Sequence, residues 1–249
     1  MAGFFNRQKH GGGFQDLLNW DGSLDGVDLK TLDRARRELL SKLGRVEQHL
    51  DLAMAQARSG DNFGARPARC SHSYRAGMMG DKIVPASLAN IKNDTQIAPD
   101  TSMYHDSTVN EISVRQVPNL NSKSHAPYGL QTDILGFDGS YLAFSVTLPA
   151  AVGTGLKENE MLKVDLRCRS EHSIPSYLRL SAKDGPNVKT LSKEVKADGH
   201  SARINFDPLE LLPSESNEKI WIDLIFNQPT YNGLKIEEFT IHRTFKAEM

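Results

Sequence analysis

The chain has 249 residues, with 30 Lys and Arg against 31 Asp and Glu and a formal net charge of −1. Hydrophobic residues make up 39% and charged residues 24%, a composition typical of a soluble globular protein, which excludes a wholly disordered chain. Neither half carries the basic excess typical of proteins that bind nucleic acid, so we expect no nucleic-acid partner.

No secretory signal and no membrane span are expected. The first residues lack an apolar run of sufficient length for a signal peptide. The longest uncharged stretch, 139–156, contains Pro149 and two internal glycines, Gly153 and Gly155, and is unsuited to a membrane helix. We expect a cytoplasmic location by default, and leave signal-independent export or assembly into a particle open.

Residues 1–27 are rich in glycine and polar side chains, which predicts a flexible arm. Residues 28–59 then predict one long amphipathic helix, with Asp28 as its N-cap and Gly60 as its stop. Large apolar residues recur at spacings of three and four, as in a short coiled coil through which the chain self-associates. The alternative is a helix packed on its own domain, which Leu40 favours by widening the apolar face. The expected oligomerisation residues are Leu32, Leu39, Leu43, Val46 and Leu50.

Residues 60–103 show no sustained period and an excess of Arg and Lys, and we expect a basic, irregular connector there. A solvated linker is a better interpretation than a phosphate-binding segment. The sequence leaves open whether a short strand forms near Ile83 and Val84.

From residue 104 to residue 249, apolar and polar residues recur with a period of two. Nine short segments in which apolar and polar residues alternate are separated by turns rich in Pro, Gly and Asn. The segments between them are too short to hold the helices that a parallel sheet would need. The sequence therefore predicts a mainly β protein, an antiparallel β-sandwich of jelly-roll type, preceded by the helix. The expected strands are 109–117, 130–135, 141–148, 162–168, 178–182, 188–195, 202–206, 220–226 and 234–241.

Signals for an enzyme are missing. The chain has no G-x-S-x-G, no phosphate-binding loop and no H-E-x-x-H, and its eight histidines are scattered. Cys70 and Cys168 have no metal-ligand spacing; we expect two reduced thiols rather than a disulfide, with Cys168 in the core. We expect no catalytic residues, no metal and no cofactor. A glycan-active enzyme with paired carboxylates such as Glu158 and Glu160 is a minor alternative.

The polar sides of three strands suggest a sugar-binding surface. If these strands share one sheet, an aromatic ring would lie beside carboxylates and guanidinium groups, the combination that stacks on a pyranose and binds its hydroxyls. The competing interpretation is a surface salt-bridge lattice with a buried Trp. The candidate residues on the strands are Trp221, Asp223, Asp165, Arg167, Arg179 and Tyr177. Tyr128, Tyr231 and Asn187 mark a second candidate site at the rim of the sandwich.

Some segments resemble a known family. The stretch APYGLQTDILGFDGSYLAFSVTLP at 126–149, Arg115-Gln116 before it, and the later GPN at 185–187 and WIDLIF at 221–226 resemble an uncharacterised domain family of alphaproteobacteria, mainly Rhodobacter relatives. That resemblance implies no activity and no catalytic residues. Separately, the strand count and the closing LKIEEFTIHR run are similar to carbohydrate-binding jelly rolls.

Two functional hypotheses follow. The first is a non-catalytic recognition module that binds a polysaccharide or other glycan through the sandwich. The second is a structural or adaptor protein that makes protein contacts in an envelope or a phage-like particle. A glycan binder needs Trp221 or a rim tyrosine exposed beside Asp or Asn, whereas an adaptor would bury Trp221 and expose an apolar patch on the helix.

Overall fold

A computed structural model of the chain describes residues 29–58, 66–119, 124–207 and 219–246. The chain divides into two units, Met1–Ala53 and Met54–Met249, which are described separately below. The predicted arm at 1–27 and the predicted caps of the helix, Asp28 and Gly60, lie outside the described residues. No helix among the described residues is long and apolar enough to cross a membrane.

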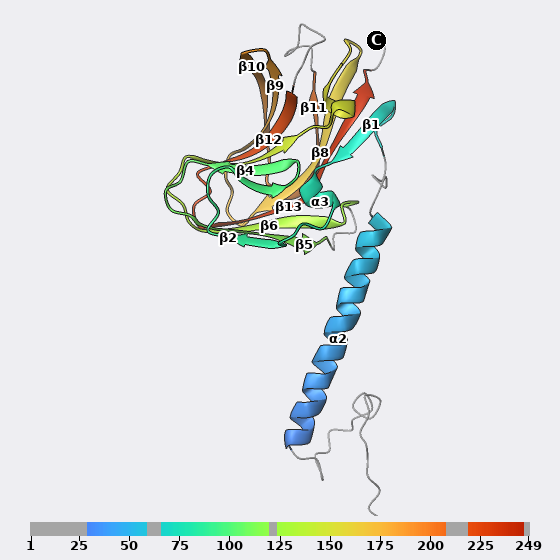
Figure 1. The fold of residues 1–249 in the computed structure, drawn as a ribbon, viewed down its shortest axis with the longest axis vertical. Helices are drawn as coiled ribbons and strands as arrows, with labels where there is room; N and C mark the ends of the chain where they lie inside the picture. Colours follow the sequence, from blue (N-terminus) through green and yellow to red (C-terminus); the bar gives the residue numbers. More distant parts are fainter. Residues whose placement is uncertain (1–28, 59–65, 120–123, 208–218, 247–249) are drawn as a thin grey trace, which may run out of the picture. The chain divides into compact units, whose positions relative to one another are not determined.

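The predicted long helix is present as α2, Leu29–Arg58 (Figure 1). Ion pairs one turn apart support its polar side: Arg37 Nη2 lies 2.7 Å from Asp33 Oδ2, and Lys42 Nζ lies 2.7 Å from Glu38 Oε1. The apolar side is open to solvent at its large residues, with Leu40, Leu43, Val46 and Leu50 among the exposed hydrophobic side chains.

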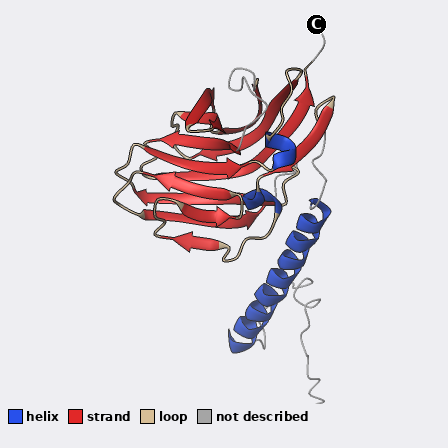
Figure 2. Cartoon of the chain, turned by 45° about the horizontal axis from the view of Figure 1, so that its top comes forward, coloured by secondary structure: helices blue, strands red, loops and turns tan. Residues whose placement is uncertain are grey.

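The second unit is a sandwich of two antiparallel sheets, seen as two layers of strands in Figure 2. Sheet A has the order β11-β8-β13-β6-β5-β2, with β1 also paired to β13; sheet B has the order β10-β9-β12-β7-β4-β3. The strands of sheet A are β1 (Cys70–Arg75), β2 (Ser87–Ala89), β5 (Glu111–Pro118), β6 (Tyr128–Gly136), β8 (Glu160–Ser170), β11 (Asp198–Phe206) and β13 (Asn232–Phe245). Those of sheet B are β3 (Thr95–Ala98), β4 (Thr101–His105), β7 (Tyr141–Thr147), β9 (Ser176–Asp184), β10 (Asn187–Val195) and β12 (Lys219–Asn227).

The apolar half of each alternation forms the core between the sheets. In sheet B, Ile222, Leu224 and Phe226 of β12 lie opposite Val146, Phe144 and Leu142 of β7, and all six are buried. The rings of Phe144 and Phe226 meet edge to face, with centroids 6.5 Å apart and planes at 84°. Nine of the observed strands coincide with the nine predicted ones, and the predicted antiparallel sandwich is confirmed.

The predicted connector is the main correction. Within its described part, 66–103, the chain forms β1, β2, β3 and the start of β4, together with the short helix α3 (Gly77–Gly80). These elements extend both sheets, so the sandwich begins near Cys70 rather than at residue 104. Residues 81–86 are irregular, so no strand forms at Ile83 and Val84.

Both cysteines are free thiols, as expected. Cys168 is buried in the core, and this burial, with a smaller contribution from Asp198, raises the pKa of its thiol to about 12. Cys70 is half-buried on β1.

Candidate ligand-binding groove

A groove of about 650 Å³ lies on the outer face of sheet B. Its floor comes largely from β7, whose outward side chains after Tyr141 are all small: Ala143, Ser145 and Thr147. Ser102 of β4 lies directly opposite Ser145 and extends the floor. Because the alternate residues of β7 are core residues, this strand fixes the floor at the centre of the sheet.

Larger side chains on the neighbouring strands form the walls. Trp221 of β12 lies opposite Thr147, and Tyr104 of β4 lies opposite Ala143, so one aromatic residue stands on each side of β7. Trp221 is partly exposed, and the ammonium group of Lys219 lies 5.8 Å from the centroid of its ring. Asp94 accepts a hydrogen bond from the Tyr104 hydroxyl, and this bond, more than burial, raises the tyrosine's pKa.

A charged pair lies beside the floor. Arg179 of β9 and Asp223 of β12 are register partners, and Arg179 Nε and Nη2 each donate to Asp223 Oδ2 at 3.0 Å. The Asp223 side chain is 5% exposed, whereas that of Arg179 is 42% exposed. Among the described residues no donor reaches Asp223 Oδ1. The groove therefore offers one carboxylate oxygen and part of a guanidinium group to a ligand.

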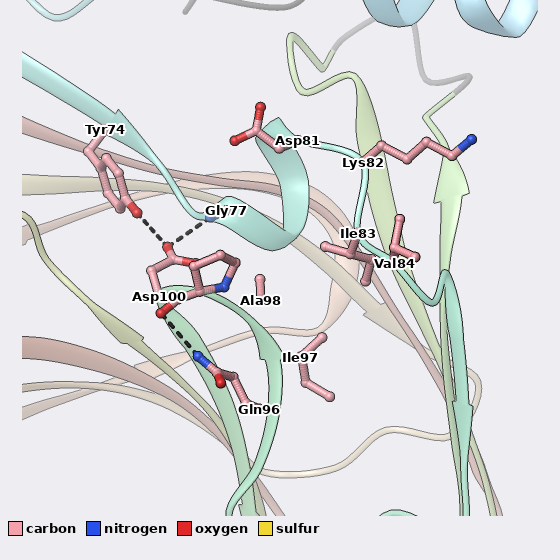
Figure 3. Close-up of a pocket in the computed structure, with 11 residues that line it drawn as sticks. Tyr74, Gly77, Asp81, Lys82, Ile83, Val84, Gln96, Ile97, Ala98 and Asp100 are labelled. Carbon is pink, nitrogen blue, oxygen red and sulfur yellow. Dashed lines mark hydrogen bonds between the residues drawn. The ribbon is translucent and has the colours of Figure 1, made fainter.

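A second hollow, of about 560 Å³, adjoins the groove at Pro99 and Asp100, which line both. Figure 3 shows Asp100 on one side of the hollow, where its Oδ2 accepts hydrogen bonds from the Tyr74 hydroxyl at 2.6 Å and the Gly77 amide at 2.8 Å. Burial, reinforced by this bond to Asp100, raises the pKa of Tyr74. Ile83 and Ile97 form an apolar side of the hollow. The bonds of Asp100 thus hold β1 and α3 against the wall of the groove.

The structure separates the predicted strand residues into two groups. Trp221, Asp223 and Arg179 come together in the groove, and Tyr177 lies on the same face of sheet B, opposite Ile225, without lining the groove. Asp165 and Arg167 lie on β8, which belongs to sheet A. The condition that all three strands share one sheet is therefore not met, because β8 pairs with β11 and β13 instead of β9.

On sheet A, Asp165 takes part in a hydrogen-bond network that joins four strands. Arg203 binds both its carboxylate oxygens at 2.6 Å, and His242 Nε2 lies 3.3 Å from Oδ2. The other ring nitrogen, His242 Nδ1, lies 2.8 Å from the Ser73 hydroxyl. This order of Ser, His and Asp is that of a nucleophilic triad. However, His242 is only 1% exposed and Arg203 engages the carboxylate fully, so we assign the network a structural role.

Arg167 is also engaged within sheet A. Its Nε donates to the Gly199 carbonyl at 2.8 Å and lies 3.7 Å from Glu237 Oε2. Its Nη1 is buried and has no hydrogen-bond partner among the described residues. These interactions place Arg167 inside the protein rather than on a binding face.

The three rim residues do not converge. Asn187 begins β10, opposite Asp184 at the end of β9. Tyr231 follows β12 and is 72% exposed, while Tyr128 begins β6 in sheet A. The structure therefore does not assemble a single site from these residues.

The sequence analysis missed Tyr104, Tyr141 and the small floor residues. A signal was present in the YLAFSVTL segment, where every outward residue after Tyr141 is small. That pattern indicates a depression only once the neighbours of the strand are known. Within the described residues, no group of three or more His, Cys, Asp or Glu side chains is arranged to hold a metal ion.

The sandwich is similar to several solved structures at low sequence identity. The bacteriophage CBA120 tailspike protein 4 enzymatically active domain is 7% identical, with a TM-score of 0.44; the match covers 63% of this chain but 21% of the tailspike chain. The family 11 carbohydrate-binding module from Clostridium thermocellum, in complex with a β-1,3-1,4-mixed-linked tetrasaccharide, is 12% identical, with a TM-score of 0.39 and coverage of 63% and 96%. TmCBM61 in complex with β-1,4-galactotriose is 14% identical, with a TM-score of 0.35 and coverage of 64% and 99%.

Two of these structures are thus carbohydrate-binding modules, and the likeness to them concerns the arrangement of strands. No curated protein matches the chain. The profile of a family of unknown function, DUF6478, matches residues 7–249, and the chain belongs to that family.

Proposed function

We propose that the protein is a non-catalytic recognition module that binds a polysaccharide along the groove of sheet B. One observation carries the proposal: a floor of small side chains runs between two aromatic residues, beside a carboxylate whose Oδ1 accepts no hydrogen bond from the described residues. Trp221 is partly exposed beside Asp223, which is the arrangement that a glycan binder requires.

Each part of the groove has a role in binding a sugar ring. The apolar face of a pyranose stacks on the indole of Trp221, as aromatic rings favour. Asp223 Oδ1 accepts a hydrogen bond from a sugar hydroxyl, and the exposed guanidinium edge of Arg179 donates to another. The hydroxyls of Ser102 and Ser145 then bind the ligand from below, as donors or acceptors.

The length of the floor favours a polymer over a single sugar. Tyr141 and Thr147 both line the groove and lie six residues apart on one extended strand, which corresponds to roughly 20 Å. A ligand that fills this length needs several linked sugar units. The proposed ligand is therefore an internal stretch of a polysaccharide chain.

An adaptor protein is the second candidate function, and one observation favours it. The apolar side of α2 is exposed at Leu40, Leu43, Val46 and Leu50. Exposed apolar side chains in such a row mark a surface for contact with protein. This surface lies on a different unit from the groove, so the two functions are compatible.

The test is a binding screen of the full chain against bacterial capsular polysaccharides and exopolysaccharides. The chain has two Trp residues, so a Trp20→Phe background leaves Trp221 as the fluorescent reporter. We expect a saturable change in fluorescence with at least one polysaccharide. With that polysaccharide, Trp221→Ala should give no calorimetric heat of binding, while circular dichroism confirms that the variant folds. Neither fluorescence change nor calorimetric heat with any member of the panel would overturn the proposal.

A further inference from the structure

The apolar side of α2 forms a continuous seam. Leu43, Val46 and Leu50 of this seam are each between 55% and 58% exposed, and Leu29 is 83% exposed. We infer that α2 pairs with the α2 of a second copy of this chain as a parallel, two-stranded coiled coil. This inference is independent of the glycan-binding proposal, because it rests on another unit of the chain.

The spacing of the seam fits a heptad repeat. Starting with Leu29 in the first position, a, the apolar residues alternate in steps of three and four through the fourth position, d. A repeat of this kind averages 3.5 residues, the period at which two helices stay in contact by supercoiling. The seam residues are Leu29, Leu32, Leu39, Leu43, Val46, Leu50 and Ala53.

Arg36 fills the one a position in this span that is not apolar. A single polar residue in such a seam favours two strands and fixes their register, at a cost in stability. The long apolar stem of Arg36 covers the seam while its charged end reaches water. Its presence therefore favours an in-register dimer over larger assemblies.

Charges beside the seam favour the parallel orientation. Lys42 occupies position g, and Glu47 occupies position e of the next heptad. In a parallel dimer the g side chain of one helix faces the following e side chain of its partner, so Lys42 meets Glu47 twice by symmetry. An antiparallel pair instead sets g against g. Lys42 already binds Glu38 within its own helix, and the three donors of its ammonium group allow both contacts.

A dimer would also explain how a long helix with an exposed apolar side is maintained. Most helices in proteins gain their stability from packing of the apolar side rather than from propensity. Gly44, which lowers helix propensity, lies outside the a and d positions and does not interrupt the seam. Pairing supplies the missing packing. It also places two grooves in one particle, so that a repetitive polymer can be held at two points.

Light scattering of the full chain tests the association. We expect twice the chain mass of 27.6 kDa for the parent and a single chain mass for Leu43→Asp. Gln48→Asp is the matched control, because Gln48 lies at position f, away from the seam, and this variant keeps the doubled mass. A parent that has the mass of one chain throughout the micromolar range overturns the inference, and so does a dimer that Leu43→Asp leaves intact.

Disulfide cross-linking tests the orientation without placing a charge in the seam. In a Cys70→Ser background, with Cys168 buried, Leu29→Cys and Leu50→Cys each introduce one reactive thiol near an end of the seam. A parallel dimer in register cross-links each variant to itself under mild oxidation. Cross-links that form only when the two variants are mixed would show antiparallel helices and overturn the parallel arrangement. A Gln48→Cys variant, on the outer side, is expected to remain uncross-linked.

Discussion

Both sheets of the sandwich carry charged strand residues, but the two sets differ in what they do. On sheet A the charged groups bind one another: Asp165 is held by Arg203 and His242, and Lys235 Nζ lies 3.1 Å from Glu237 Oε1. The hollow on that face, lined by Lys235 and Arg169 among others, measures about 260 Å³. On sheet B the groove is larger and Asp223 keeps an oxygen free of described donors.

The difference comes from side-chain size on one strand. The outward residues of β7 after Tyr141 are small, so they leave a depression between the longer side chains of β12 and β4. On sheet A the corresponding outward residues of β8 and β13 are long and reach one another. A polar surface is thus hollowed where small residues lie between long ones.

Filling the floor should remove this difference and have the largest effect on binding. We expect Ser145→Tyr to weaken polysaccharide binding about a hundredfold, which corresponds to about 2.7 kcal/mol. The ring would occupy the groove while leaving the inward core residues of β7 unchanged. Ser192→Tyr is the matched control: Ser192 lies in the same register row, opposite Arg179, but on β10 outside the groove. Equal affinity of both variants in isothermal titration calorimetry would contradict a role for the floor.

Removing the central carboxylate of sheet A should affect stability instead. We expect Asp165→Asn to lower the free energy of unfolding by about 2 kcal/mol, because it leaves Arg203 and buried His242 without their charged partner. Polysaccharide affinity should stay at the parent value. Urea denaturation and calorimetry check the two parts separately, and a loss of affinity in a folded variant would show that the faces are not independent.

The same carboxylate should also make stability depend on acid. Burial alone would raise the pKa of Asp165, but hydrogen bonds from Arg203 and His242 outweigh it and hold the pKa at about 2. An unfolded Asp has a pKa of about 3.9, so this stabilisation is complete above about pH 4 and is lost as the pH falls through 2. The fall in pKa from about 3.9 to about 2 corresponds to at most about 2.6 kcal/mol at ~1.4 kcal/mol per pKa unit. Urea midpoints measured from pH 5 to pH 2 should fall less steeply for Asp165→Asn than for the parent.

The carboxylate of sheet B should show the reverse behaviour, with the smallest effect on stability. We expect Asp223→Asn to cost about 1 kcal/mol, because Arg179 is 42% exposed and can turn to water when its partner is neutral. Binding should weaken at least tenfold, since an amide replaces the acceptor that faces the ligand. An Asp223→Asn protein that binds normally but unfolds more easily would assign Asp223 the same structural role as Asp165.

Most of the fold could be predicted because a strand that is buried on one side has apolar residues at every second position of its sequence. β8 and β12 show this period clearly and were found. β1, with the sequence CSHSYR, and the three-residue β2 contain too few apolar residues to show an alternation of apolar and polar side chains. The sequence therefore predicts a connector where these two strands lie. Short strands of this kind are specified by their pairing with β13 and β5, which a local pattern does not reveal.

The site was predicted in part, for a related reason. The alternation in β12 and β9 correctly places Trp221, Asp223 and Arg179 on an outward face. Which sheet each strand joins depends on pairing between distant segments, and Asp165 was therefore grouped with strands from which it is separated. Tyr104 joins the groove through the pairing of β4 with β7, which sets it opposite Ala143, 39 positions later in the sequence, and no local pattern reveals that pairing.

The position of the groove floor has a consequence for the speed and thermodynamics of binding. Each floor residue of β7 is preceded by a core residue, Leu142, Phe144 or Val146, and all three of these are fully buried. The floor therefore cannot rearrange without disturbing the interior, and a ligand meets a surface already in its bound shape. Little conformational entropy is lost by the protein on binding. Association should follow simple one-step kinetics, with an observed rate that rises linearly with ligand concentration instead of reaching a plateau.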